Sequence, residues 1–221
     1  MQIYFVRHGR TQFNLEHRFQ GGRSDSPLTA DGIAGARAAG RYLATTEFGQ
    51  VYSSPQQRAL DTAAYIVAEN QFKPAVTVAP GFREFDFGTW DGQKEADVQP
   101  RAYAQVLLKQ PGVYDPQQAG GGESYATFVA RTTAAVHAIV DQATDARPLL
   151  VVSHGLVTTM TVKTLLGVPV ADLRAPLVVN GRTLKTIGNG IVENDSLTIL
   201  ETTDNQNFTL KKWNETSFLD S

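Results

Sequence analysis

Two stretches of the chain share one pattern: Ile3-Tyr4-Phe5-Val6-Arg7-His8-Gly9 and Leu149-Leu150-Val151-Val152-Ser153-His154-Gly155. Each runs through four apolar residues, one polar residue, a histidine and a glycine. Four consecutive apolar residues rich in β-formers are typical of a strand that is buried on both faces, as in a parallel sheet. The sequence therefore predicts two central strands, each followed directly by a histidine.

Helical patterns separate these strands from further short strands. Strands that alternate with helices predict an α/β fold with a mainly parallel central sheet and helices on both faces. No repeat or composition shift marks a boundary, so we predict a single domain over residues 1–221. Helices are predicted to begin after a Thr29 cap, at Glu123 and at Leu156. A further helix is predicted with Ser54 as N-cap and Pro55 as first helical residue. The further predicted strands are 51–53, 196–200 and 208–213, of which the last two are joined through 204–207.

The composition excludes several classes of function. Lys and Arg number 20 against 22 Asp and Glu, a formal charge of -2, which argues against broad electrostatic capture of nucleic acid or of an anionic membrane. The absence of cysteine excludes disulfides, thiolate zinc sites, iron–sulfur clusters and a cysteine nucleophile. The N-terminus lacks the basic region of a signal peptide, and no apolar run approaches the roughly 18 residues of a membrane span, so we expect a cytoplasmic protein.

The two strand-end histidines point to a phosphoryl-binding pocket. In an open α/β sheet, ligands bind at the carboxyl ends of the strands, where His8 and His154 are expected. The helix predicted after strand 51–53 would bring its N-terminus and Arg58 to the same edge. Imidazole can act as a covalent nucleophile, and arginines can neutralise the oxygens of a transferring phosphoryl group.

These residues resemble the motifs of the histidine phosphatase superfamily, which includes cofactor-dependent phosphoglycerate mutases and their phosphatase relatives. The resemblance covers residues 3 to about 156, with a further match in the tail, and the ordered set is far more specific than any one motif. The motifs are Arg7-His8-Gly9, Gln20-Gly21, Ser53-Ser54-Pro55 with Arg58-Ala59, Arg83-Glu84 ahead of Gly88-Thr89-Trp90-Asp91-Gly92, Ser153-His154-Gly155, Asn194-Asp195-Ser196 and Asn214-Glu215-Thr216.

The resemblance implies a role for each matched residue. His8 would become phosphohistidine, Arg7, Arg58 and His154 would complete the phosphate pocket, and Glu84 would be the general acid. The carboxyl groups of Asp86 and Asp91 lie in the same loop, and Asp86 remains the alternative acid. The residues expected to bind substrate are Thr11, Asn14, Gln20, Gly21 and Gly155.

The function expected from this resemblance is a phosphomonoester phosphatase acting on small phosphorylated metabolites through a phosphohistidine on His8. The segment 19–29 is closer to the phosphatase branch than to the glycolytic mutases. Two readings stay open beside it: a cofactor-dependent phosphoglycerate mutase, and a non-catalytic phosphate-binding regulatory module. Arg10 stands where relatives commonly have Glu or Gln and would add positive charge beside the pocket. Phe218 stands where many relatives have a histidine.

We expect no cofactor and no metal at this site. Two histidines and a carboxylate could hold zinc, but neighbouring arginines would weaken metal binding and strengthen phosphate binding. His17 is expected in an exposed loop, and His137 on a helix whose apolar stripe explains the segment without it. The expected partner is a small phosphorylated substrate, with neither nucleic acid nor membrane, and a homodimer is left open.

Overall fold

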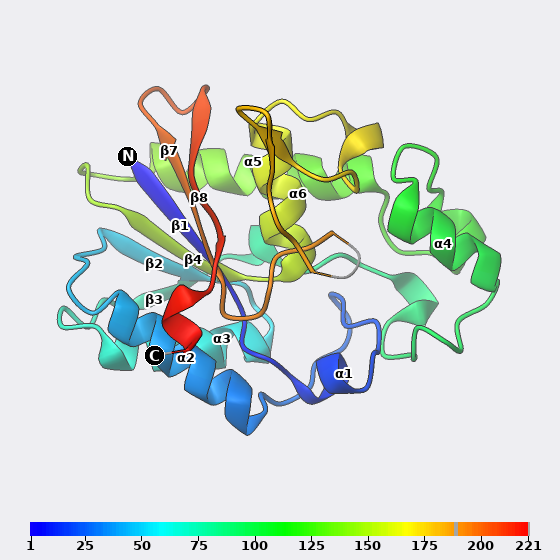
Figure 1. Ribbon diagram of the computed structural model, residues 1–221, viewed down its shortest axis with the longest axis horizontal. Coiled ribbons are helices and arrows are strands. Elements are labelled where there is room, and N and C mark those ends of the chain that lie inside the picture. Colours follow the sequence, from blue (N-terminus) through cyan, green and yellow to red (C-terminus); the bar gives the residue numbers. More distant parts are fainter. Residues whose placement is uncertain (188–189, 221) are drawn as a thin grey trace.

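The computed structural model describes residues 1–187 and 190–220. Strands β1 (Gln2–Arg7) and β4 (Leu149–Ser153) lie side by side in parallel at the centre of a six-stranded sheet of order β3-β2-β4-β1-β7-β8 (Figure 1). All five residues of β4 are buried, as its apolar run predicts. The two stretches of like design are therefore the two central strands.

The remaining strands make the sheet mixed. β2 (Gln50–Ser53) and β3 (Val76–Val78) continue it in parallel on the β4 side. On the β1 side, β7 (Leu197–Thr202) and β8 (Phe208–Glu215) are antiparallel and form the predicted hairpin. A separate two-stranded ribbon pairs β5 (Val178–Val179) with β6 (Arg182–Thr183). The prediction of a mainly parallel α/β sheet is confirmed.

Helices cover both faces of the sheet, as the alternating pattern predicts (Figure 1). α2 (Ala30–Tyr42) and α3 (Gln57–Glu69) pack on one face, and α5 (Tyr125–Asp141) and α6 (Gly155–Leu165) on the other. The short α1 (Gln12–Leu15) and α4 (Arg101–Lys109) lie beyond the carboxyl ends of the parallel strands. No helix in the described ranges is long and apolar enough to cross a membrane.

The predicted start of α3 is two residues too early. Neither Ser54 nor Pro55 is in the helix, whose N-cap is Gln56 without a side-chain cap. The Ser54 hydroxyl is engaged elsewhere, with the side chains of Gln56 and His154. The carboxylate of Asp25, from a distant loop, instead accepts the backbone N–H of Gln57 at 2.6 Å. A tertiary contact thus replaces the local cap that the sequence favoured.

The sequence pattern did not predict the fold of residues 95–121. Residues 80–122 consist of loops, short turns and α4, and their aromatic side chains form a cluster with those of α5, in which the rings of Phe85 and Tyr125 lie 5.2 Å apart. The cluster forms one wall of the site described below. The short helical turns of the chain are η1 (Pro80–Phe82), η2 (Gly88–Trp90), η3 (Pro116–Ala119), η4 (Val170–Asp172) and η5 (Ser217–Asp220).

Candidate active site

His8 leaves the end of β1 beside the end of β4. Its backbone N–H donates to Ser153 O at 2.9 Å, and the side chain is buried. Its Nδ1 lies 2.8 Å from Gly9 O, and its Nε2 accepts from Arg58 Nε at 3.3 Å. A carbonyl only accepts and a guanidinium only donates, so Nδ1 carries the proton and Nε2 carries the lone pair, which accepts from Arg58.

Arg58 reaches the site from the first turn of α3 and is 1% exposed. Besides His8, its guanidinium donates to Gly21 O at 3.1 Å and to Ser24 O at 3.1 Å, and it pairs with Asp25 at 3.0 Å. Arg58 therefore connects the nucleophile position to the loop 20–25. A planar fork of donors suits this multiple role, which a lysine could not fill.

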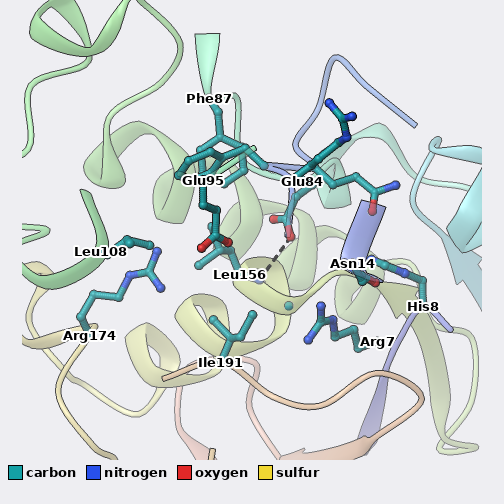
Figure 2. Close-up of a pocket in the computed structure, with 14 residues that line it drawn as sticks. Arg7, His8, Asn14, Glu84, Phe87, Glu95, Leu108, Leu156, Arg174 and Ile191 are labelled. Atoms are coloured by element: carbon teal, nitrogen blue, oxygen red, sulfur yellow. Dashed lines mark hydrogen bonds between the residues drawn. The ribbon is translucent and has the colours of Figure 1, made fainter. Parts of the chain in front are cut away.

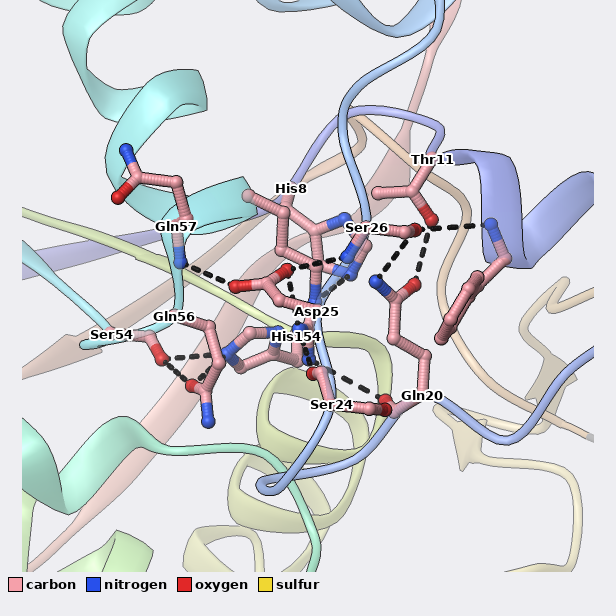
Figure 3. Close-up of polar contacts among 12 residues, drawn as sticks. His8, Thr11, Gln20, Ser24, Asp25, Ser26, Ser54, Gln56, Gln57 and His154 are labelled. Carbon is pink, nitrogen blue, oxygen red and sulfur yellow. Dashed lines mark hydrogen bonds and ion pairs between the residues drawn. The ribbon is translucent and has the colours of Figure 1, made fainter. Parts of the chain in front are cut away.

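His154 is the N-cap residue of α6 and is completely buried. Its Nε2 lies 2.6 Å from Ser54 Oγ and 2.9 Å from Gln56 Oε1 (Figure 3). The Ser54 hydroxyl donates to Gln56 Oε1, so Ser54 Oγ and Gln56 Oε1 both act as acceptors toward a protonated Nε2. His154 Nδ1 has no hydrogen-bond partner among the described residues.

Arg7, the last residue of β1, places a second guanidinium beside the N-terminus of α6. Its Nη1 donates to Val192 O at 2.7 Å, and its Nε has no partner within the described chain. Gly155 permits this packing, since a Cβ there would lie 3.2 Å from Arg7 Nε and 3.0 Å from Ile191. The guanidinium and the helix N-terminus together favour an anionic ligand.

Glu84 is the acid that faces the pocket. Its carboxylate accepts from the backbone N–H of Phe85 at 2.9 Å and of Leu156 at 3.3 Å (Figure 2). Burial raises the pKa of Glu84, while these hydrogen bonds and Arg58 oppose the rise. Asp86 instead pairs with Arg23, and Asp91 accepts from Gly21 N, Arg23 N and the Ser24 hydroxyl. Of these three acids, Glu84 alone is among the residues that line the pocket.

Burial and positive charge keep both histidines neutral. The pKa of His8 lies well below its ordinary value because burial, Arg58 and Arg7 all disfavour the imidazolium. Burial, Arg58 and His8 lower the pKa of His154 likewise. Burial also lowers the pKa of Arg7 to about 10, so Arg7 stays charged at neutral pH. The site thus combines an uncharged nucleophile with fixed cations.

The ten predicted site residues gather at this one place. Arg58 contacts His8, and the ring of His154 lies 5.2 Å from that of His8. Thr11 and Gly21 contact site residues without lining the pocket. Thr11 donates to Gln20 Oε1 at 2.6 Å, and Gly21 O accepts from Arg58. The other six, which line the pocket directly, are Arg7, His8, Asn14, Gln20, Glu84 and Gly155.

Two departures from the family pattern lie away from the pocket. Arg10 is exposed and lines a separate hollow between α2 and residues 193–195, so the hypothesis that its charge flanks the phosphate pocket fits the structure poorly. Phe218 is buried and stacks on Tyr42 at 4.7 Å, at the α2 side of the sheet. His17 is exposed, and His137 on α5 contacts Asn205, as their sequence contexts indicated.

Sequence reasoning missed several residues of the site. Gln56 and Asp25 orient His154 and Arg58, and Asn194 donates to His8 O at 2.9 Å. Glu95 and Arg174 line the outer pocket. The tail motif containing Asn194 was a usable signal, whereas the other four residues stand in no local pattern. Among the described residues, no group of three His, Cys, Asp or Glu side chains could hold a metal ion.

The fold and the site define a phosphoryl-transfer enzyme built on an α/β sheet, and comparison with known proteins identifies its class. The family model for the histidine phosphatase superfamily (branch 1) matches residues 3–216. The chain therefore belongs to this superfamily and is an enzyme of the histidine phosphatase class. The resemblance carried by the motifs is confirmed.

Individual relatives differ in the activity that their names state. A protein of Proteus mirabilis named probable phosphoglycerate mutase GpmB is 33% identical over 172 residues, which are 76% of each chain. The structure of Bacillus stearothermophilus YhfR superposes with a TM-score of 0.85 at 26% identity, covering 99% of this chain and 98% of that one. A mycobacterial glucosyl-3-phosphoglycerate phosphatase, solved with VO3, gives a TM-score of 0.80 at 28% identity, covering 96% and 98%.

Proposed function

We propose that this protein is a phosphomonoester phosphatase that hydrolyses small phosphorylated metabolites through a phosphohistidine on His8. The observation that carries the proposal is the pair of hydrogen bonds on the His8 ring. Gly9 O accepts from Nδ1 and Arg58 Nε donates to Nε2, which makes Nε2 the nitrogen with the nucleophilic lone pair. The low pKa of His8 keeps this lone pair available at neutral pH.

The reaction proceeds in two displacements. In the first, His8 Nε2 attacks phosphorus, the P–N bond forms, the P–O bond to the alcohol breaks, and Glu84 gives its proton to the leaving oxygen. In the second, water attacks phosphorus, the Glu84 carboxylate takes a proton from it, and the P–N bond breaks to release inorganic phosphate. The raised pKa of Glu84 favours the protonated form that the first step requires.

Arg7, Arg58 and His154 hold the phosphoryl oxygens. The guanidinium groups neutralise the charge on the equatorial oxygens of the transition state. The unpartnered Nδ1 of buried His154 becomes a donor when a phosphoryl dianion draws a proton to that ring. Both sides of the His154 ring are then hydrogen-bonded, to the phosphoryl group on one side and to Ser54 and Gln56 on the other.

A second candidate is phosphoglycerate mutase activity, which the name of the relative from Proteus mirabilis favours. The two activities share the first displacement and differ in the acceptor. Glu95 at the outer end of the pocket is exposed, so the pocket opens to solvent there and offers water a path toward the site as the acceptor. This favours hydrolysis.

The test measures both reactions with the same enzyme. p-Nitrophenyl phosphate should release inorganic phosphate catalytically. With 3-phosphoglycerate and its bisphosphorylated primer, inorganic phosphate should form faster than 2-phosphoglycerate. Faster isomerisation than phosphate release would assign the mutase activity. If the enzyme turned over none of a broad panel of phosphomonoesters, the result would favour the alternative of a non-catalytic phosphate-binding regulatory module.

A further inference from the structure

The pocket extends beyond the phosphoryl site to a second polar end. Figure 2 shows His8 and Arg7 at one side of the pocket, Glu84 in the middle, and Glu95 and Arg174 at the other side. Leu156 and Ile191 lie between the two polar ends, and Phe87 and Leu108 also line the pocket near Glu95 and Arg174. A substrate whose leaving oxygen is at Glu84 therefore has its far end near Glu95 and Arg174.

Arg174 is held in this position by Tyr125, a buried residue of α5. Its Nε donates to the hydroxyl of Tyr125 at 2.7 Å, and its guanidinium lies 5.6 Å from the centre of the Tyr125 ring. Tyr125 is 1% exposed and itself donates to Leu107 O at 2.7 Å. The position of the cation is thus fixed by the core before any ligand arrives.

The backbone on both sides of Arg174 is fixed as well. The ammonium of Lys163, 1% exposed on α6, donates to Leu173 O at 2.8 Å and to Ala175 O at 2.6 Å. Burial lowers the pKa of Lys163 to about 8, which shows that this connection is made against a desolvation cost. The hydrogen bonds from Lys163 therefore give the backbone around Arg174 a defined position.

Glu95 contributes the opposite charge. It follows the 88–92 turn, its backbone N–H donates to His17 O at 2.9 Å, and its carboxylate points into the pocket (Figure 2). Partial desolvation of its carboxyl group raises the pKa of Glu95, while the charges of His17 and Arg174 counteract the rise. Arg18 also lines the pocket but pairs with Glu16, so the charges of Arg174 and Glu95 balance each other at this end. Balance selects against a second strongly anionic group and favours hydroxyl groups, which both donate and accept.

We propose that Arg174 and Glu95 form a distal subsite that binds the hydroxylated end of a sugar or polyol phosphate. Arg174 donates to a substrate hydroxyl oxygen and Glu95 accepts a substrate O–H, while the carbon chain packs on the apolar wall. The subsite rests on the proposed function for its orientation, since the phosphoryl group occupies the His8 end. It makes Arg174 and Glu95 the residues that determine specificity.

The test compares phosphates of equal carbon number with and without hydroxyl groups: glycerol 1-phosphate against n-propyl phosphate, ribose 5-phosphate against n-pentyl phosphate, and glucose 6-phosphate against n-hexyl phosphate. Calorimetry on the His8→Ala protein measures binding, and kcat/KM is measured on the otherwise unchanged enzyme. At least one hydroxylated compound should bind about tenfold more tightly than its partner, since hydrogen bonds to charged groups are worth about that much or more.

Arg174→Gln and Glu95→Ala should each remove most of this preference, about tenfold. Arg147→Gln and Glu47→Gln are the matched controls, because these residues form an ion pair that is exposed and absent from the pocket lining. Glu95 is exposed, so its variant keeps the test valid even where loss of Arg174 disturbs the fold.

Three outcomes would overturn the subsite. The first is that no pair of compounds shows a preference for the hydroxylated member, or that both variants keep this preference. The second is a preference for 3-phosphoglycerate that Glu95→Ala raises, which indicates an anion site. The third is tightest binding of O-phosphoserine, which indicates an ammonium–carboxylate site. The binding measurement needs no turnover, so an inactive enzyme would contradict the proposed function and leave the subsite result standing.

Discussion

The imidazole rings of His8 and His154 lie 5.2 Å apart with their planes at 62°. The register of the sheet explains this contact, because Arg7 on β1 pairs with Ser153 on β4, and each histidine is the next residue. Two copies of one short pattern, four apolar residues and then a polar residue and a histidine, thus place their histidines together when the strands align in parallel. Besides burial and Arg58, the neighbouring His8 ring lowers the pKa of His154.

Phosphorylation during turnover is predicted to occur on His8. The hydrogen bonds at Gly9 O and Arg58 leave its Nε2 as the nucleophile, whereas His154 Nε2 faces Ser54 and Gln56. Quenching the enzyme with labelled substrate should trap an acid-labile, base-stable label on the peptide that contains His8. The His8→Gln variant is the control and should give none. Label on Ser54 or on His154 would refute this assignment.

Replacing Arg58 by lysine is predicted to lower kcat/KM roughly 10²-fold or more, the loss seen when one oxyanion donor is removed. A lysine keeps the charge but cannot contact His8, Gly21, Ser24 and Asp25 together. Steady-state kinetics on p-nitrophenyl phosphate give the measurement. Arg37→Lys is the matched control, since Arg37 is a surface residue of α2 that pairs with Glu69. Equal activity of the two variants would remove Arg58 from the site.

The sequence predicted the central strands, and it predicted residues that the structure brings together at one pocket, because both depend on local patterns. Apolar runs are buried wherever a parallel sheet forms, and the residue after each run must emerge at the same edge. The family resemblance favoured Glu84 as the acid and left Asp86 open as the alternative, because the carboxyl groups are close in sequence. Only the packing of segment 80–122 turns one of them inward.

Residues that act through distant partners could not be predicted. Asp25 caps α3 and pairs with Arg58 although more than thirty residues separate them along the chain. Ser54 has the sequence context of an N-cap, yet its hydroxyl contacts His154. Arg174 follows a segment without periodic pattern, and its position depends on Lys163 and Tyr125. Such contacts depend on tertiary geometry, which local sequence propensities do not predict.

Activity is predicted to need no divalent metal. Arg7 and Arg58 supply the charge neutralisation that Mg²⁺ provides at other phosphoryl-transfer sites. Dialysis against EDTA should leave kcat unchanged, and added zinc or magnesium should not raise it. Vanadate should inhibit, since its trigonal bipyramid resembles the transition state. A loss of activity that zinc restores would contradict the prediction.

Glu84→Gln is predicted to slow phosphoenzyme formation in proportion to the basicity of the leaving group. An alkoxide needs a proton to depart, whereas p-nitrophenolate does not, so the loss on an alkyl phosphate should exceed that on the aryl one by about 10²-fold or more. Single-turnover measurements isolate this step from the later hydrolysis. The matched control is Asp86→Asn, in the same loop but paired with Arg23.

The same acid predicts a pH dependence. Its protonated form is required for alkyl leaving groups, so phosphorylation by the unaltered enzyme should slow as pH rises through the raised pKa of Glu84. The Glu84→Gln variant should lack this limb, because an amide does not titrate. Equal losses on both substrates would mean that Glu84 only shapes the pocket. A leaving-group dependence in Asp86→Asn instead would make Asp86 the acid.

Asp195→Asn is predicted to stabilise the protein more at high pH than at low pH. Asp195 is 4% exposed, its Oδ1 has no partner among the described residues, and burial raises its pKa to about 8. Between the unfolded pKa of about 3.9 and this value, the unfolded chain loses a proton that the folded protein keeps, so stability falls as pH rises. Asparagine does not titrate and tolerates the left-handed φ of 59° at this position.

Urea unfolding gives the measurement. From about pH 5 to about pH 8, the free energy of unfolding of the variant should rise by on the order of 1–3 kcal/mol relative to that of the unaltered protein. The exposed Asp97→Asn variant, compared in the same way, should gain little. An equal effect of Asp195→Asn at both pH values would show that its carboxyl is ionised in the folded protein, held by the neighbouring charge of Arg7.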